Sequence, residues 1–137
     1  MRSILYTAVG SLLVVLPATA IAERPQTVAE RAAIQQALFD DVRAHGKPAH
    51  PIITRISVST VRLGRPVGKN RYTKFARADL SDPQAGFAAA LLGYYSASIS
   101  GWRVLDLGSS EVGCTIPAKT FRGRKRAVMR DLELDCP

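Results

Sequence analysis

The first amphipathic segment of the chain begins at Thr27-Val-Ala-Glu30, which has the spacing of a capping box. In that motif the hydroxyl and the carboxylate satisfy amide donors at a helix start. Apolar residues then recur three and four positions apart and form one stripe, which consists of Ile34, Ala37, Leu38 and Val42. Gly46, followed by two prolines, ends the pattern. We therefore predict one long helix between Thr27 and Gly46.

From Ile52 the pattern changes to an alternation typical of strands. The β-branched run 52–61 predicts a half-buried strand, and 72–80 a weaker one. Segment 87–95 is ambiguous, because its alanines and leucines favour a helix while its aromatics and flanking turns favour a strand. Since 102–107 is the next strand, we interpret 87–95 as one arm of an antiparallel meander.

The C-terminal part of the chain has a weaker pattern. Pro117 opens an irregular segment, and 124–132 predicts a short helix with Val128 and Leu132 four positions apart. The expected fold class is α+β, with one N-terminal helix packed on a curved four-stranded antiparallel sheet and a short C-terminal helix.

The N-terminal residues have the pattern of a signal peptide. Arg2 precedes a thirteen-residue apolar run, and Ala18-Thr-Ala20 or Ala20-Ile-Ala22 offers a cleavage site. A retained membrane anchor is the alternative, but the run is shorter than the roughly 20 residues that span a bilayer. We therefore predict a signal peptide at 1–22 and a single exported domain at 23–137, in the periplasm or outside the cell and without a transmembrane anchor.

The excess of positive charge in the chain favours anionic binding partners. The mature chain would carry eighteen Lys and Arg against eleven Asp and Glu. Because export excludes nucleic acid, the expected partners are anionic envelope components, such as cell-wall polymers, lipopolysaccharide and membrane surfaces, or acidic proteins. The densest basic segment follows Phe121 and supplies the candidate anion-binding residues Arg122, Arg124, Lys125 and Arg126. The alternative is a basic loop that only keeps the domain soluble.

Exactly two cysteines follow the apolar run, Cys114 and Cys136. In an exported chain they are expected to form a disulfide, which the chain-entropy model values at roughly 3 kcal/mol, although two separate buried thiols are the alternative. Together with His45 and His50, the two cysteines provide the residue types of a zinc site with two cysteine and two histidine ligands. The cysteines are too far apart in sequence for a zinc knuckle, so we predict no metal and no cofactor.

The segment Trp102-Arg-Val-Leu-Asp-Leu-Gly-Ser-Ser-Glu-Val-Gly-Cys114, with the terminal Cys136, resembles a family of uncharacterised bacterial exported proteins with the pattern W-R-V-x-D-L-G-[ST]-x-x-V-G-C. The resemblance implies a cystatin-like or NTF2-like fold and one disulfide. It transfers no activity and no functional residue. The cystatin inhibitory motif Gln-x-Val-x-Gly is absent, because 60–64 has other residues at its first and third positions.

Residues 108–113 invite comparison with the nucleophile elbow of hydrolases. Val112 stands where the second glycine is required and no histidine follows, so we interpret the segment as a turn.

The acids Asp131, Glu133 and Asp135 are expected on a solvated face. Asp106 lies inside an apolar strand, where a structural hydrogen bond is favoured over a carboxyl group of raised pKa.

The sequence thus favours a small non-enzymatic binding domain of unknown partner, which binds anionic envelope polymers or an acidic protein through its basic C-terminal segment. The alternative is a small-ligand carrier or an enzyme with a pocket between helix and sheet. The side chains expected to line that pocket are Tyr72, Phe75, Tyr94, Tyr95 and Asp106.

Overall fold

The computed structural model describes residues 23–45, 51–83 and 86–137. The predicted signal peptide, Gly46 and His50 lie outside the described residues. No helix within the described ranges combines the length and the apolar character needed to cross a bilayer.

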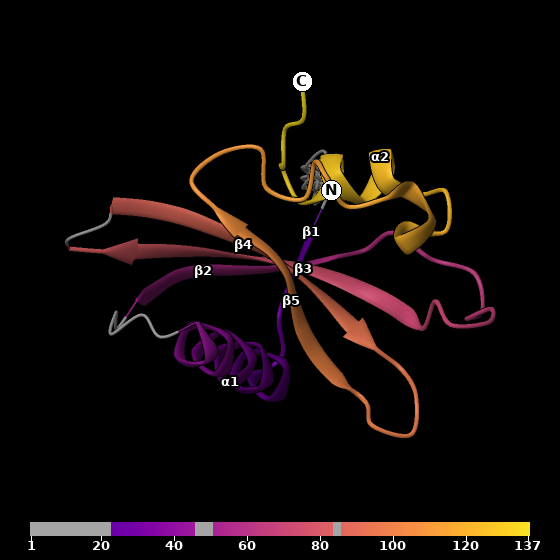
Figure 1. The fold of residues 1–137 in the computed structure, drawn as a ribbon, viewed down its shortest axis with the longest axis horizontal. Helices are drawn as coiled ribbons and strands as arrows, with labels where there is room; N and C mark the ends of the chain where they lie inside the picture. Colours follow the sequence, from indigo (N-terminus) through magenta and orange to yellow (C-terminus); the bar gives the residue numbers. More distant parts are fainter. Residues whose placement is uncertain (1–22, 46–50, 84–85) are drawn as a thin grey trace, which may run out of the picture.

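The sheet is an antiparallel meander in which each strand pairs with the next one along the chain (Figure 1). Its four long strands confirm the predicted set: β2 (Ile52–Ser59), β3 (Tyr72–Asp82), β4 (Gly86–Tyr95) and β5 (Gly101–Gly108). The ambiguous segment is therefore a strand, because it pairs with strands on both sides. A three-residue strand that the sequence did not predict, β1 (Glu23–Pro25), extends the sheet beside β2.

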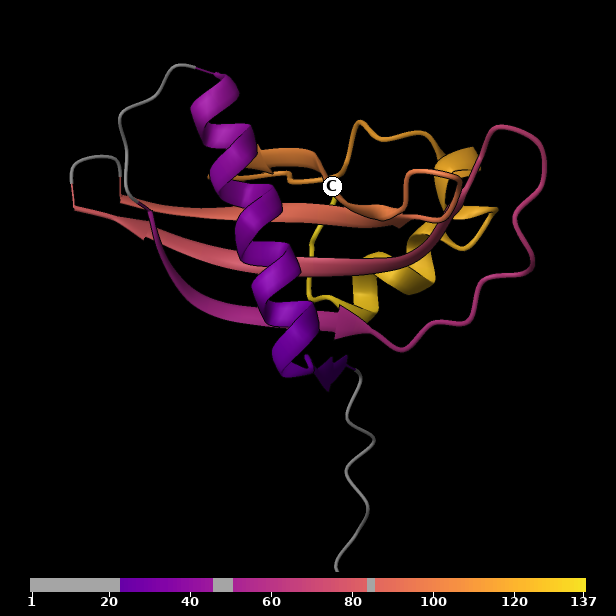
Figure 2. The ribbon, with the colours of Figure 1, turned by 90° about the horizontal axis from the view of Figure 1, so that it is seen from below.

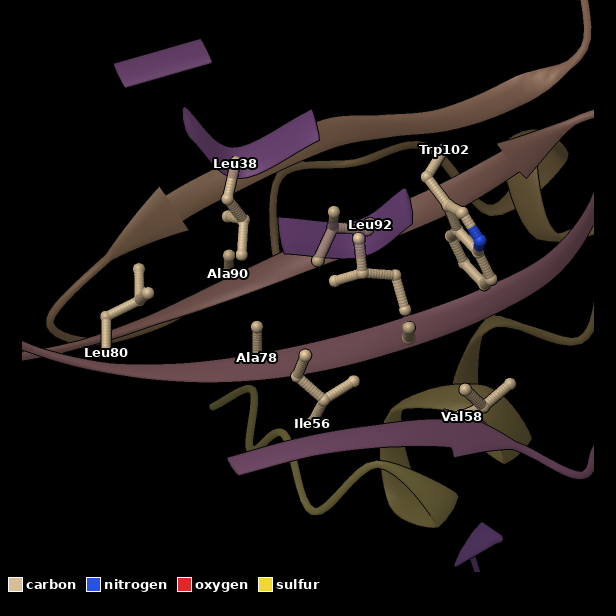
Figure 3. Packing of buried hydrophobic residues seen from close by; sticks show 10 residues of the cluster. Leu38, Ile56, Val58, Ala78, Leu80, Ala90, Leu92 and Trp102 are labelled. Atoms are coloured by element: carbon tan, nitrogen blue, oxygen red, sulfur yellow. The ribbon is translucent and has the colours of Figure 1, made fainter. Parts of the chain in front are cut away.

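Helix α1 (Val28–Ala44) crosses one face of the sheet (Figure 2). The Thr27 hydroxyl oxygen accepts a hydrogen bond from the Glu30 amide at 3.1 Å, which confirms the predicted N-cap. The predicted stripe provides its three buried side chains, Ile34, Leu38 and Val42. Ile34 and Leu38 pack in one cluster with residues of the sheet (Figure 3), which include Ile56, Val58, Ala78, Leu80, Ala90, Leu92 and Trp102.

The C-terminal segment covers part of the opposite face of the sheet. It contains a 3-10 helix, η1 (Ala118–Phe121), and α2 (Lys125–Asp131), and in Figure 2 it lies behind the sheet while α1 lies in front. Val128 and Leu132 are fully buried there. They belong to a second core cluster, whose buried members are Phe75, Leu91, Val112, Phe121, Val128, Met129, Leu132 and Leu134. The fold thus has three layers: helix, sheet and C-terminal segment.

The C-terminal layer is tied to the rest of the chain at several points. The predicted disulfide between Cys114 and Cys136 is present, with 5.5 Å between the two Cα atoms. The guanidinium of Arg77, on the central strand, donates to the carbonyl oxygens of Leu132 and Glu133 at 3.1 and 2.6 Å. Arg77 therefore satisfies carbonyl groups at the C-terminal end of α2, where positive charge is favourable.

Candidate anion-binding surface

Three segments that are separate in sequence meet at one end of the sheet. The meander places the β2–β3 and β4–β5 connections at the same end, on the right in Figure 1. Hydrogen bonds then join η1 and the residue after it to this end. The Asn70 side-chain amide donates to the carbonyl oxygen of Lys119, and the Arg122 guanidinium donates to that of Tyr72. We call the three segments 60–74, 93–103 and 115–126 together the basic end.

The basic end contains no acidic residue. It carries eleven of the nineteen lysines and arginines of the chain and none of its eleven aspartates and glutamates. Eight of these cationic side chains are exposed: Arg62, Arg65, Lys69, Lys74, Arg103, Lys119, Arg124 and Arg126. The surface is bounded on the α2 side, where Arg126 shares a shallow groove with Glu133 and Asp135. Positive potential is therefore concentrated at one end of the molecule.

The four residues predicted to bind anions fall into two pairs. The first pair, Arg122 and Lys125, donates hydrogen bonds to backbone carbonyl oxygens of the protein. Arg122 donates to the Tyr72 carbonyl, while its Nε and Nη1 are buried without a hydrogen-bond partner among the described residues. Burial lowers the pKa of the Arg122 guanidinium, which nonetheless remains charged. The Lys125 ammonium donates to the carbonyl oxygens of Cys114 and Ile116, both at 2.6 Å.

The second pair faces solvent. Arg124 and Arg126 are exposed, and no ion pair within the described ranges involves either of them. They are therefore the members of the predicted set that a partner can reach.

Aromatic rings hold two further cations in place at the basic end. The Lys74 ammonium lies 5.0 Å from the centroid of the Tyr94 ring, and the Arg103 guanidinium carbon lies 3.8 Å from that of Tyr95. Tyr94 is itself fixed by an edge contact with the buried Trp102, with 5.5 Å between the ring centroids. Because rings restrain these long side chains, less conformational entropy is lost when they bind an anion.

The structure does not bring the five predicted pocket residues together. Phe75 is fully buried on the C-terminal face, where its ring contacts that of Phe121, and Tyr72 packs in the same cluster. Tyr94 packs with the cluster on the opposite face, under α1. Tyr95 contacts Tyr72 edge-on, with 5.4 Å between the ring centroids. These four aromatic side chains therefore contribute to packing rather than to a common cavity.

Asp106 is bound by backbone amides. Its Oδ1 accepts from the amide of Leu107 at 2.9 Å, and its Oδ2 accepts from that of Gly113 at 2.6 Å. Gly113 has a φ of +80°, and a Cβ there would lie 2.7 Å from Leu91. The carboxylate thus fixes the return of the chain after β5, so that the glycine–serine segment 108–113 serves as a structural turn.

A pocket of about 410 Å³ does lie between α1 and β5, and Asp106 belongs to its lining. The other lining residues are Asp41, Val42, His45, Val104, Leu105 and Leu107. The Asp41 carboxylate lies 3.6 Å from Nδ1 of His45. Neither of these side chains is buried, so the pocket is an open site at the rim of the core.

The prediction that Asp131 lies on a solvated face is wrong. Its side chain is buried, and Oδ2 accepts hydrogen bonds from the Ser59 hydroxyl and the Thr60 amide, both at 2.6 Å. The reason is geometric, because Asp131 lies three residues after Val128 and so on the face of α2 that packs against the sheet. Its neighbour Glu133 is exposed, as expected, and contacts Arg55 at 3.3 Å.

Within the described ranges no three His, Cys, Asp or Glu side chains are grouped closely enough to hold a metal ion. Comparisons of the chain with protein-family models, with curated proteins and with solved structures found no match. The resemblance of residues 102–114 to an exported family, and with it the cystatin-like or NTF2-like fold name, stays a prediction.

Proposed function

We propose that this protein is an exported, non-enzymatic binding domain that contacts an anionic envelope component, either a polymer or a lipid surface, or an acidic protein through its basic end. The observation that carries the proposal is the convergence of three acid-free segments with eight exposed cations at one end of the sheet. A basic composition that served solubility alone would need no such separation, since solubility is best served by interspersed charges of both signs.

The separation of charge has a direct consequence for binding. Opposite charges within a Debye length, about 8 Å at physiological ionic strength, cancel much of a local potential. Because the basic end has no acids in its three segments, its cations add up instead. A polyanion or an acidic surface would be attracted to this end and oriented by it.

The proposed export has its own support. The disulfide requires an oxidising compartment to form and persist, and residues 1–22 have the pattern of a signal peptide. In that compartment the available polyanions are envelope polymers and anionic lipids rather than nucleic acid.

The test compares two pairs of arginine or lysine substitutions on a heparin column, with heparin as the polyanion probe. The Lys69→Gln/Arg124→Gln variant removes two exposed cations of the basic end, and Arg31→Gln/Arg43→Gln removes two exposed cations of α1. Both variants lose the same net charge. We expect the first to elute at clearly lower salt than the second, because only the first weakens the concentrated potential. Equal elution of the two variants contradicts the proposal.

A small-ligand carrier is the second candidate, because the pocket between α1 and β5 has the position that such a function requires. His45 lines the pocket and is exposed, so the His45→Trp substitution fills it without disturbing the core. A small molecule that raises the melting temperature of the wild type but not of this variant supports the carrier. A ligand that stabilises both proteins equally does not bind there.

A further inference from the structure

Two exposed apolar side chains lie at the basic end. Val67, in the β2–β3 connection, is 76% exposed, and Ile99, in the β4–β5 connection, is 79% exposed. Exposed apolar residues are common singly, but these two stand at the two loops that project from the same end of the sheet (Figure 1). They lie among the cations of an acid-free surface, and Val67 is flanked in sequence by Arg65 and Lys69.

Hydrogen bonds shape both loops and join them. Val67 pairs with Asn70 in an isolated β-bridge, which closes a tight turn around Gly68. The Ser100 hydroxyl donates to the carbonyl oxygen of Ala97 at 2.7 Å and so closes the turn that contains Ile99. Between the loops, the Ser96 amide donates to the carbonyl oxygen of Arg71 at 2.9 Å. The two apolar tips are therefore presented by ordered turns that share one end of the fold.

We propose that the basic end docks on an anionic lipid bilayer, with Val67 and Ile99 inserted between the headgroups and the surrounding cations placed against anionic headgroups. This inference rests on the proposed function and names its partner. A soluble polyanion would satisfy the cations but would leave the two apolar tips in water, and a protein partner would need an apolar patch set among its acids to cover them. A bilayer interface offers negative charge and an apolar phase within a few ångströms of each other, and so matches both features.

The opposite end of the sheet provides a natural comparison. Ile52 and Phe87 are also exposed, at 59% and 80%, and both are paired in register with Ser81. However, the same end carries the acids Asp79 and Asp82. The Asp79 carboxylate is paired with Arg77 at 2.7 Å, so this end lacks the acid-free surplus of cations that an anionic membrane would attract. The second apolar pair is therefore not expected to dock and serves as the matched control.

The experiment is co-sedimentation of the oxidised protein with sucrose-loaded vesicles. We expect binding to vesicles of phosphatidylglycerol and phosphatidylcholine, weaker binding at high salt, and little binding to phosphatidylcholine alone. The Val67→Ser/Ile99→Ser variant should bind the mixed vesicles about tenfold more weakly, because it no longer buries two apolar side chains. The Ile52→Ser/Phe87→Ser control should bind like the wild type. Equal binding of the two variants overturns the insertion of the tips.

A second measurement reports insertion directly. A Val67→Trp variant should show a blue shift and gain of fluorescence on addition of the mixed vesicles, whereas a Phe87→Trp control should not. The native Trp102 is buried and contributes the same background to both proteins. The absence of a vesicle-induced change in Val67→Trp contradicts the inference even if sedimentation shows binding.

The heparin column separates the failure of this inference from the failure of the proposed function. Retention on heparin that depends on Lys69 and Arg124, without binding to the mixed vesicles, overturns the membrane inference and points to a polymer or an acidic protein as partner. Absence of both activities overturns the inference and the proposed function together. Vesicle binding that serine at the two tips weakens supports both.

Discussion

The buried carboxylate of Asp131 gives the sharpest test of how the C-terminal layer is held on the sheet. Its Oδ2 accepts from the Ser59 hydroxyl and the Thr60 amide at 2.6 Å, and from the Thr60 hydroxyl at 3.2 Å. These donors lie at and just beyond the end of β2, more than seventy residues away in sequence. The Asp131→Ala substitution removes the acceptor and leaves the Ser59 hydroxyl and the Thr60 amide without it.

The loss of stability expected from Asp131→Ala is large for a domain of this size. A hydrogen bond to a charged group contributes about 1.5–3 kcal/mol, and each buried donor left unsatisfied costs about 1–3 kcal/mol, with overlap between the two figures. We therefore expect Asp131→Ala to lower the free energy of unfolding by about 3–5 kcal/mol, a substantial part of the 5–15 kcal/mol typical of such domains. Ser59→Ala should cost less, because it removes one donor and leaves the carboxylate its other partners.

The assay is urea unfolding of the oxidised proteins, followed by circular dichroism. The exposed Asp135, which lies four residues further along the chain and beyond the end of α2, provides the control Asp135→Ala, with an expected change within about 0.5 kcal/mol. In the double-mutant cycle, Asp131→Ala and Ser59→Ala should be coupled by at least about 1 kcal/mol, because they remove the same hydrogen bond. A loss below 1 kcal/mol for Asp131→Ala, or additive effects in the cycle, would refute this account of how α2 is anchored.

Two further predictions concern the turn after β5 and the tail. Gly113→Ala should lower the free energy of unfolding by about 2–4 kcal/mol, because the residue has a φ of +80° and its new Cβ would lie 2.7 Å from Leu91. The control Gly123→Ala, at φ +77° in open space, should lower it by only about 1–2 kcal/mol. Similar losses for the two variants in urea unfolding would contradict the packing argument. Reduction of the Cys114–Cys136 disulfide should lower stability by about 3 kcal/mol, and a melting temperature unaffected by reductant would contradict a stabilising role.

The parts of the fold that local patterns specify were predictable from the sequence. The Thr27 cap and the stripe of Ile34, Leu38 and Val42 are set by helical periodicity, and the structure confirms them. The four long strands follow from alternation and turns, and even the ambiguous 87–95 was resolved by its neighbours. The disulfide followed from the number of cysteines and the expected compartment.

The contacts of the C-terminal layer were not predictable in this way, because they join residues far apart in sequence, although the short helix predicted over 124–132 is confirmed by α2. Nothing in the local pattern around Asp131 indicates that Ser59 and Thr60 supply its donors. For the same reason the roles of Arg122 and Lys125 were not foreseen, since each donates to carbonyl oxygens of other segments. A run of charges in the sequence does not show which of its members face inward.

Only one segment of the candidate site was predicted from the sequence. The run 121–126 was recognised as basic, but segment 60–74 was interpreted only as a loop and a strand, although its five cations and lack of acids can be read directly. What the sequence could not supply was the convergence of the two segments, which depends on the meander and on the hydrogen bond from Asn70 to Lys119. The site is therefore a property of the topology as much as of composition.

The four C-terminal cations have two different structural roles, and this difference determines how the function can be tested. Arg122 and Lys125 hold η1 and α2 in place by donating to backbone carbonyls, while Arg124 and Arg126 face solvent. Neutralising all four would remove surface charge and loosen the C-terminal layer at once, so that a loss of binding would have two explanations. Substitutions confined to exposed cations alter the potential alone. Binding that falls in step with the number of exposed cations removed, at constant melting temperature, would therefore assign the activity to the surface rather than to the stability of the fold.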